Sequence, residues 1–183
     1  MSSRQRDSLY QKELKPVAHS HWGSWGSASF CPEQSWAAGF GLKVEFDQGS
    51  VLDDSALNAV KLLCYDGNGT QYVSSVSSSV GGLGSWGSNL FCSGNKNFLN
   101  GIRLRSEDVM NSRVCHCSLL IQGYRVRVEK DGRGLDETAA NNVDFSCEDG
   151  EKLDGNGMYW GYYSDWLTCP AGTAICGIQT RGL

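Results

Sequence analysis

A short phrase of alternating apolar residues recurs along this chain and constrains its fold more than any other feature. It reads GFGLKVE at Gly39–Glu45, GIRLRSE at Gly101–Glu107 and GYRVRVE at Gly123–Glu129, and a clipped copy, GIQTRGL, occupies Gly177–Leu183. Each copy begins with glycine, and apolar residues alternate with others in the first three copies. A period of two is typical of a half-buried β-strand. The pattern therefore predicts β-strands repeated along the chain.

A second, acidic phrase occurs twice, as VLDDSALNAVKLLC at Val51–Cys64 and GLDETAANNVDFSC at Gly134–Cys147. Taken alone, the first copy could form an amphipathic helix. Comparison of the copies favours a turn followed by a strand that ends at each cysteine, because Val60, Leu62 and Cys64 match Val143, Phe145 and Cys147 at equal offset.

A third, aromatic phrase reads WGSWGSASFC at Trp22–Cys31 and GSWGSNLFC at Gly84–Cys92, with a looser copy, WGYYSDWLTC, at Trp160–Cys169. The chain thus consists of units of roughly 50–60 residues. Each unit contains an aromatic turn, a cysteine, a strand, an acidic turn and a second strand. We expect each unit to form a small antiparallel sheet, and three sheets to close around one core.

Length and composition agree with one all-β domain that has no nucleic-acid partner and does not insert into membranes. The 183 residues include 23 glycines and 3 prolines, a balance typical of strands joined by turns. The net charge is −4, and the 16 basic residues form no cluster that could neutralise a run of phosphates. No apolar run approaches the roughly 18–20 residues that cross a bilayer.

Eight cysteines predict a disulfide framework, and hence an extracellular location. The first twenty residues, MSSRQRDSLYQKELKPVAHS, are charged throughout and do not resemble a secretory signal. Removal of a signal, an incorrectly assigned start or unconventional export would each reconcile the two observations.

In their order and spacing, WGSWG, GFGLKVE, the DDSALN and DETAANN phrases and CPAGTAICGIQT resemble the vitelline membrane outer layer protein 1 family, from Trp22 to Thr180. The resemblance implies an all-β fold, a β-prism of three Greek-key antiparallel sheets about a pseudo-threefold axis, tied by disulfides. It also implies a secreted protein of egg coats and mucosal secretions, with carbohydrate binding and a chito-oligosaccharide transferase activity.

The chain departs from the family pattern in two places. A segment near 108–128, either an insertion or a degenerate extra unit, brings Cys115 and Cys117, and the third unit is truncated at GIQTRGL. We expect a flexible arm at 1–20 and one β-prism domain at 21–183, with units at about 21–80, 81–150 and 151–183. Disulfides are predicted for Cys31–Cys64 and Cys92–Cys147. The pairing of Cys115, Cys117, Cys169 and Cys176 stays open.

Acidic residues are the first candidates for function, because Glu45, Asp53 and Asp54 recur as Glu129, Asp136 and Glu137. Glycoside chemistry needs two carboxyl groups about 5–10 Å apart, for which the candidates are Glu45, Asp54, Glu107, Glu129 and Asp136. The alternative is that the acids cap backbone amides, and repetition favours it, because an active site is needed once but a turn in every unit. Three acidic loops at one end of a prism would still bind sugar hydroxyls, which makes Glu45, Asp53, Asp54, Glu129, Asp136 and Glu137 candidate ligand-binding residues.

Tryptophans are the second candidates, since sugars stack on indole rings. The repeated Trp22, Trp25, Trp86 and Trp160 are expected to be core and turn anchors, which leaves Trp36 and Trp166 as candidate ligand-binding residues. We predict no cofactor, because GLGSWG precedes no helix, and no metal site, because Cys115 and Cys117 lack a second ligand pair. Asn68 lies in the one glycosylation sequon and is modified only if the protein is exported.

These features together predict a non-enzymatic, disulfide-braced protein of an extracellular coat or mucosal secretion, which binds oligosaccharides or glycoproteins of a matrix. The alternatives are a weak glycosyl transferase or hydrolase acting on N-acetylglucosamine oligomers, a lectin with one defined sugar, and a truncated product without function.

Overall fold

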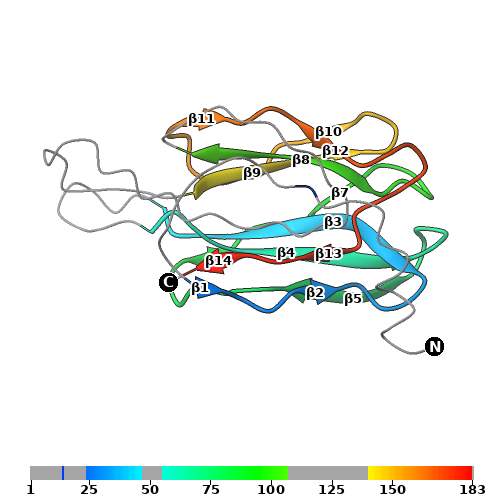
Figure 1. Cartoon of the computed structure of the whole chain (residues 1–183), viewed down its shortest axis with the longest axis horizontal. Coiled ribbons are helices and arrows are strands. Elements are labelled where there is room, and N and C mark those ends of the chain that lie inside the picture. The colour runs from blue at the N-terminus through cyan, green and yellow to red at the C-terminus, as the bar shows by residue number, and fades with distance from the viewer. Residues whose placement is uncertain (1–13, 15–23, 47–54, 107–139, 183) are drawn as a thin grey trace, which may run out of the picture.

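The structure is a computed structural model that describes residues 14, 24–46, 55–106 and 140–182 (Figure 1). Every regular element among these residues is a β-strand, which confirms the predicted all-β class. The helical alternative for the first acidic phrase is wrong, because Leu57–Asp66 is one strand, two residues longer than predicted. The second copy forms the strand Ala140–Cys147 and ends at its cysteine, as predicted.

The first sheet is a Greek key. Its three successive strands are antiparallel neighbours, and the chain then returns along the far edge of the first of them. The strands are β3 (Ser35–Val44), β4 (Leu57–Asp66) and β5 (Tyr72–Ser77), with β6 (Ser85–Trp86) and β7 (Leu90–Phe91) returning beside β3. Because β3 and β4 lie in the centre, they carry the apolar phrases that face the core.

The second sheet repeats this order of strands (Figure 1). It contains β8 (Leu99–Ser106), β9 (Ala140–Cys147) and β10 (Lys152–Leu153), with β11 (Tyr162–Tyr163) and β12 (Leu167–Thr168) returning beside β8. In the third unit, β13 (Gly177–Ile178) pairs with β2 (Ser29–Phe30) and β14 (Arg181–Gly182) pairs with β1 (Ser24–Trp25). The first two and the last two strands thus pair with each other, and together they form the third part of the prism.

The pairing register shows that the three parts are equivalent. The first glycine of each strand phrase faces the outer strand at the same position: Gly39 faces Phe91, Gly101 faces Thr168, and Gly177 faces Phe30. The cysteine after each outer strand donates its amide to the residue before that glycine, over 2.9, 2.6 and 2.8 Å in the bonds Cys92 to Ala38, Cys169 to Asn100 and Cys31 to Cys176. The predicted β-prism is thus confirmed.

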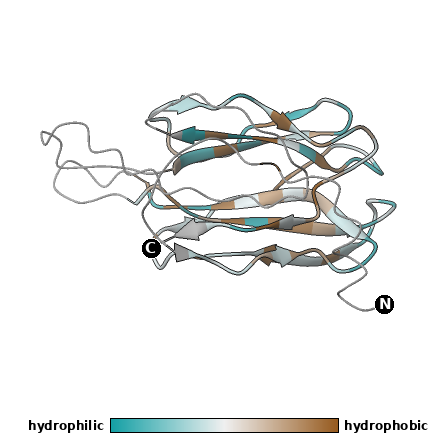
Figure 2. Ribbon diagram, in the orientation of Figure 1, coloured by the Kyte–Doolittle hydropathy of each residue, from teal (hydrophilic) through white to brown (hydrophobic). Residues whose placement is uncertain are grey.

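The core lies between the sheets at the pseudo-threefold axis. Ala37, Leu99 and Ile175 occupy equivalent positions and are fully buried, and they are linked by backbone hydrogen bonds from Ala37 to Ile175 (2.8 Å) and from Ile175 to Leu99 (2.7 Å). The rings of Phe40 and Phe145 pack with centroids 4.4 Å apart. Figure 2 shows hydrophobic segments along the central strands, as the period of two predicts.

Both predicted disulfides are present, and each one joins two neighbouring parts of the prism. Cys31, after β2, is bonded to Cys64 on β4, and Cys92, after β7, is bonded to Cys147 at the end of β9. The closed loops span 33 and 55 residues, for which chain entropy predicts about 4 kcal/mol of stabilisation each.

Two expectations require correction. A sequence unit does not form its own sheet, because each aromatic phrase returns along the preceding sheet, as Greek-key order requires. The N-terminal arm is not free of the domain at Leu14, which is 2% exposed within the core. The second strand phrase at 123–129, the 108–128 segment, Cys115 and Cys117 lie outside the described residues.

Candidate functional site

Glu45, directly after β3, is hydrogen-bonded to the residues that precede β4. Its Oε2 accepts hydrogen bonds from the backbone amide of Ser55 (3.1 Å) and from the Ser55 hydroxyl (2.6 Å). The Glu45 amide donates to the carbonyl of Ala56 (2.8 Å), and the Asn58 side chain donates to the Ser55 hydroxyl (2.7 Å). The carboxylate therefore ties the end of β3 to the segment before β4 by accepting a backbone amide, in agreement with the capping interpretation.

The other acidic candidates lie outside the described residues, so no separation between carboxyl groups is measured for them. They are Asp53, Asp54, Glu107, Glu129, Asp136 and Glu137.

The two candidate tryptophans belong to different sheets and are both in contact with other side chains. Trp36, on β3, packs against Phe98 with ring centroids 6.0 Å apart. The ring of Trp166 has Lys152 Nζ 3.8 Å and Arg103 Cζ 4.9 Å from its centroid. Arg103 and Lys152 therefore both form cation–π contacts with this candidate ring.

A buried acidic residue that the sequence analysis did not select organises the outer face of the second sheet. Asp144, on β9, is 1% exposed and pairs with the neighbouring Arg103 through Nε at 2.7 Å and a second guanidinium nitrogen at 2.6 Å. Its Oδ1 accepts bonds from the Tyr163 hydroxyl (3.1 Å) and the Gly155 amide (3.0 Å). Such a fully bonded carboxylate holds four segments of the chain together.

The environment of this network shifts two pKa values. Burial raises the pKa of the Asp144 carboxyl above its usual range, although bonds from Gly155 and Arg103 oppose the shift. Burial, together with the negative charges of Asp144 and Asp154, raises the pKa of Tyr163 to about 12. At neutral pH the Tyr163 hydroxyl therefore stays a donor. The network is closed upon itself, which is the arrangement of a structural cluster.

The first sheet carries a different outer face, here called the first-sheet shelf. It consists of Trp86, Lys61, Asn89, Phe91, Tyr65 and Tyr72. Lys61 Nζ lies 4.6 Å from the centroid of the Trp86 ring. The ring centroid of Tyr65 lies 6.0 Å from that of Phe91 and 5.8 Å from that of Tyr72.

Glycines on β3 lie beneath the side chains of this shelf and leave room for them. A Cβ atom at Gly41 would lie 2.5 Å from Lys61 Cε and 2.8 Å from Asn89 Oδ1, so both side chains cover that glycine. A Cβ atom at Gly39 would likewise meet the Phe91 ring at 2.6 Å. Trp86 faces Lys43 and Phe91 faces Gly39, four positions along β3, so the shelf is about 13 Å long.

Trp86 and Trp25 occupy equivalent positions in two parts of the prism and are each 39% exposed. The expectation that they are core anchors is wrong, because the outer strands place these side chains on the outside of the sheets. Trp160, in contrast, packs against the core as expected. Alternation in the sequence separates two faces of a strand but does not say which of them meets solvent.

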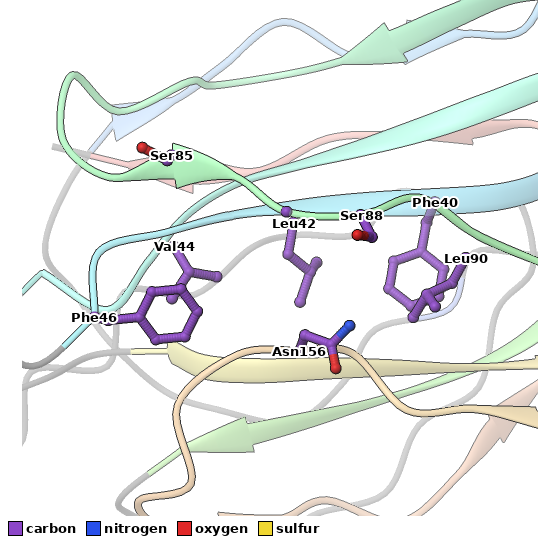
Figure 3. A pocket seen from close by; sticks show the side chains of 9 residues that line it. Phe40, Leu42, Val44, Phe46, Ser85, Ser88, Leu90 and Asn156 are labelled. Carbon is purple, nitrogen blue, oxygen red and sulfur yellow. The ribbon is translucent and has the colours of Figure 1, made fainter.

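The cleft drawn in Figure 3 lies on the other side of β3. Phe40, Leu42, Val44 and Leu90 point into it, and Asn156 lies opposite them. Its volume is about 50 Å³, against roughly 300–1,000 Å³ for pockets that enclose small ligands. A sugar ring does not fit in this cleft.

One group of potential metal ligands occurs among the described residues: Cys147, Asp149 and Glu151. The Cys147 sulfur is bonded to Cys92. The Glu151 carboxylate accepts bonds from the Ser93 amide (2.8 Å) and hydroxyl (3.0 Å), which holds two loops together. These contacts assign the group to loop structure.

The sequon residue Asn68 is exposed, in a turn whose Asp66 carboxylate accepts bonds from the amides of Thr70 (2.8 Å) and Gln71 (2.9 Å). Its side chain is therefore sterically accessible to modification. Within the described parts of the chain there is no helix with the length and apolarity of a membrane span.

Comparison with known proteins identifies the family. A distant likeness, with a TM-score of 0.47 and 11% identity over 92% of this chain and 90% of the other, links the structure to artocarpin in complex with mannotriose, and it supports no conclusion. Proteins named vitelline membrane outer layer protein 1 homolog are 35% identical over 173 residues in Homo sapiens (94% of this chain, 73% of that protein) and 38% identical over 161 residues in Mus musculus (87% and 68%). The family model for vitelline membrane outer layer protein I matches residues 12–113 and 108–182. The chain belongs to the vitelline membrane outer layer protein I family.

Proposed function

We propose that this chain is a non-enzymatic, carbohydrate-binding structural protein of an extracellular coat or mucosal secretion, and that glycans bind on the first-sheet shelf. The observation that carries the proposal is the exposed ring of Trp86 beside the polar groups of Lys61 and Asn89. Sugars present apolar C–H faces that stack on aromatic rings, while neighbouring amides and ammonium groups bond their hydroxyls. The aromatic cluster of Tyr65, Tyr72 and Phe91 extends the shelf beyond the reach of one ring.

Two described acids, Glu45 and Asp144, favour binding over catalysis. The Glu45 carboxylate is used by the amide and hydroxyl of Ser55, and the Asp144 carboxylate is paired with Arg103. A general acid or nucleophile needs a carboxyl group that can reach the glycosidic bond, whereas these two groups already bond to their own fold.

Three observations support a location outside the cell. Two disulfides brace the domain, as is usual in oxidising compartments. The Asn68 sequon is exposed. The relatives carry the name of an outer layer of a vitelline membrane.

The test compares wild type with Trp86→Ala on a panel of neutral and acidic oligosaccharides. Trp25→Ala is the matched control, because that ring is equally exposed at the equivalent position in the third part of the prism. Binding that is lost in Trp86→Ala and kept in Trp25→Ala supports the proposal. Binding that survives Trp86→Ala, or no binding by wild type, overturns it. Turnover of chito-oligosaccharides that disappears in a folded Glu45→Gln variant would overturn the non-enzymatic assignment.

A further inference from the structure

The charges around the first-sheet shelf narrow the class of glycan. We propose that the shelf binds an acidic glycan, an oligosaccharide that carries carboxylate or sulfate groups. The inference rests on the proposed function of the shelf and deepens it by naming the ligand class.

Lys61 supplies a cation at the centre of the shelf. Its ammonium group lies 4.6 Å from the centroid of the exposed Trp86 ring, and no acidic side chain in the described part of the chain forms an ion pair with it. An ammonium group held over an aromatic ring can form a charge-assisted hydrogen bond with an anion on a sugar that binds at that ring. A neutral sugar offers it only hydroxyl and amide oxygens.

The other charged side chains on the strands of this sheet do not neutralise Lys61. The charged side chains on the five strands of the first sheet are Lys43, Lys61 and Asp66. Lys43, the residue of β3 that faces Trp86, donates from Nζ to the carbonyls of Gly81 (2.6 Å) and Gly82 (3.2 Å). Asp66 lies at the other end of β4, where its carboxylate is used by Thr70 and Gln71. Near Trp86 the strands therefore carry two cations, while the carboxylate of Glu45, directly after β3, accepts hydrogen bonds from Ser55.

In the second sheet, the charges at the equivalent positions are paired with each other within the protein. Gly41 faces Lys61 in the first sheet, and Arg103 faces Asp144 at the equivalent place in the second. There the repeat provides its own anion, at 2.6 Å from the guanidinium group. Lys152 also lies over a tryptophan ring in that sheet, but Asp144 and Asp154 belong to the same cluster. Among the described sheets, the shelf therefore has a cation without an acidic partner in the described part of the chain, and an anion from a ligand would complement its charge.

The experiment measures affinities of the full chain by calorimetric titration at low salt. The probes are hyaluronan hexasaccharide, which carries carboxylates, chondroitin sulfate hexasaccharide, which adds sulfates, and chitohexaose, which is neutral. The variants are Lys61→Gln and the matched control Lys152→Gln, which removes an equivalent cation from a tryptophan ring of the second sheet.

We expect wild type to bind at least one acidic probe about fivefold more tightly than chitohexaose, a preference of about 1 kcal/mol. Lys61→Gln should remove this preference and Lys152→Gln should retain it. Chitohexaose binding that equals or exceeds acidic binding, and that still depends on Trp86, would leave the proposed function standing and overturn the acidic-glycan inference. An equal loss in Lys152→Gln would also overturn it, because the preference would then arise from overall charge. Absence of binding to all three probes would overturn both.

Discussion

Removing the Arg103 side-chain charge should destabilise this protein in a pH-dependent way. The Asp144 carboxylate is 1% exposed, so without Arg103 its charge is left with the Tyr163 hydroxyl, the Gly155 amide and a long bond from the Asn142 side chain. Breaking a buried ion pair by removing one partner costs about 3–5 kcal/mol. Because the Arg103 side chain is itself 30% exposed and other donors to Asp144 remain, we expect Arg103→Met to cost about 2–3 kcal/mol at pH 7.

The sign of the pH dependence follows from the raised pKa of Asp144. A carboxyl whose pKa is higher in the folded state contributes stability that is full below its unfolded value of 3.8 and is lost as pH rises through the folded value. Loss of Arg103 raises the folded pKa further. The destabilisation by Arg103→Met should therefore be small below pH 3.8 and grow toward neutral pH.

Urea denaturation followed by circular dichroism at pH 3 and pH 7 measures this effect. Arg105→Met is the control, since Arg105 lies on the same strand and its Nε donates to the carbonyl of Gly161 (3.1 Å). In a cycle with Asp144→Asn, the Arg103→Met substitution should cost about 1 kcal/mol or less. A destabilisation that is equal at both pH values, or no larger than that of Arg105→Met, would refute the reasoning.

Three further predictions follow from single contacts. Glu45→Gln should lower the free energy of unfolding by about 1 kcal/mol, measured in urea, because the charged acceptor of the two Ser55 bonds is lost; an unchanged value would contradict the capping role. Gly84→Ala should lower the melting temperature far more than Gly82→Ala, because at Gly84 a Cβ would lie 2.5 Å from backbone atoms at a φ of +74°, whereas Gly82 has open space; equal shifts would contradict it. In an ultraviolet titration of the phenols, Tyr163 should ionise near pH 12. The stability that its protonated hydroxyl provides should be lost between pH 10 and 12. A Tyr163→Phe variant that leaves the titration curve near pH 12 unchanged would contradict the shift.

The repeated phrases predicted the central strands and three sheets around one core, and the resemblance to the family supplied the β-prism. Val60, Leu62 and Cys64 match Val143, Phe145 and Cys147 because the core imposes the same alternation on both sheets. The two disulfides were predicted from the resemblance to the family, and the structure contains them.

The outer faces were not predictable in the same way. Lys61 and Asp144 occupy the same place in the repeat, yet one borders an exposed tryptophan and the other is buried in an ion pair. The difference comes from the segments that return along the outer edge of each sheet, which are far away in the sequence and bring Asn89 to one sheet and Trp166 to the other. Period-two alternation does not encode that pairing.

Chemical-shift mapping by NMR with hyaluronan hexasaccharide tests most directly the claim that the first-sheet shelf is the glycan-binding surface. We predict that the perturbed signals include the Trp86 indole and the amides of Lys61 and Asn89, while the indoles of Trp25 and Trp166 stay unchanged. Perturbations that cluster around Trp166 or Trp25, or spread evenly over the three outer faces, would contradict the account.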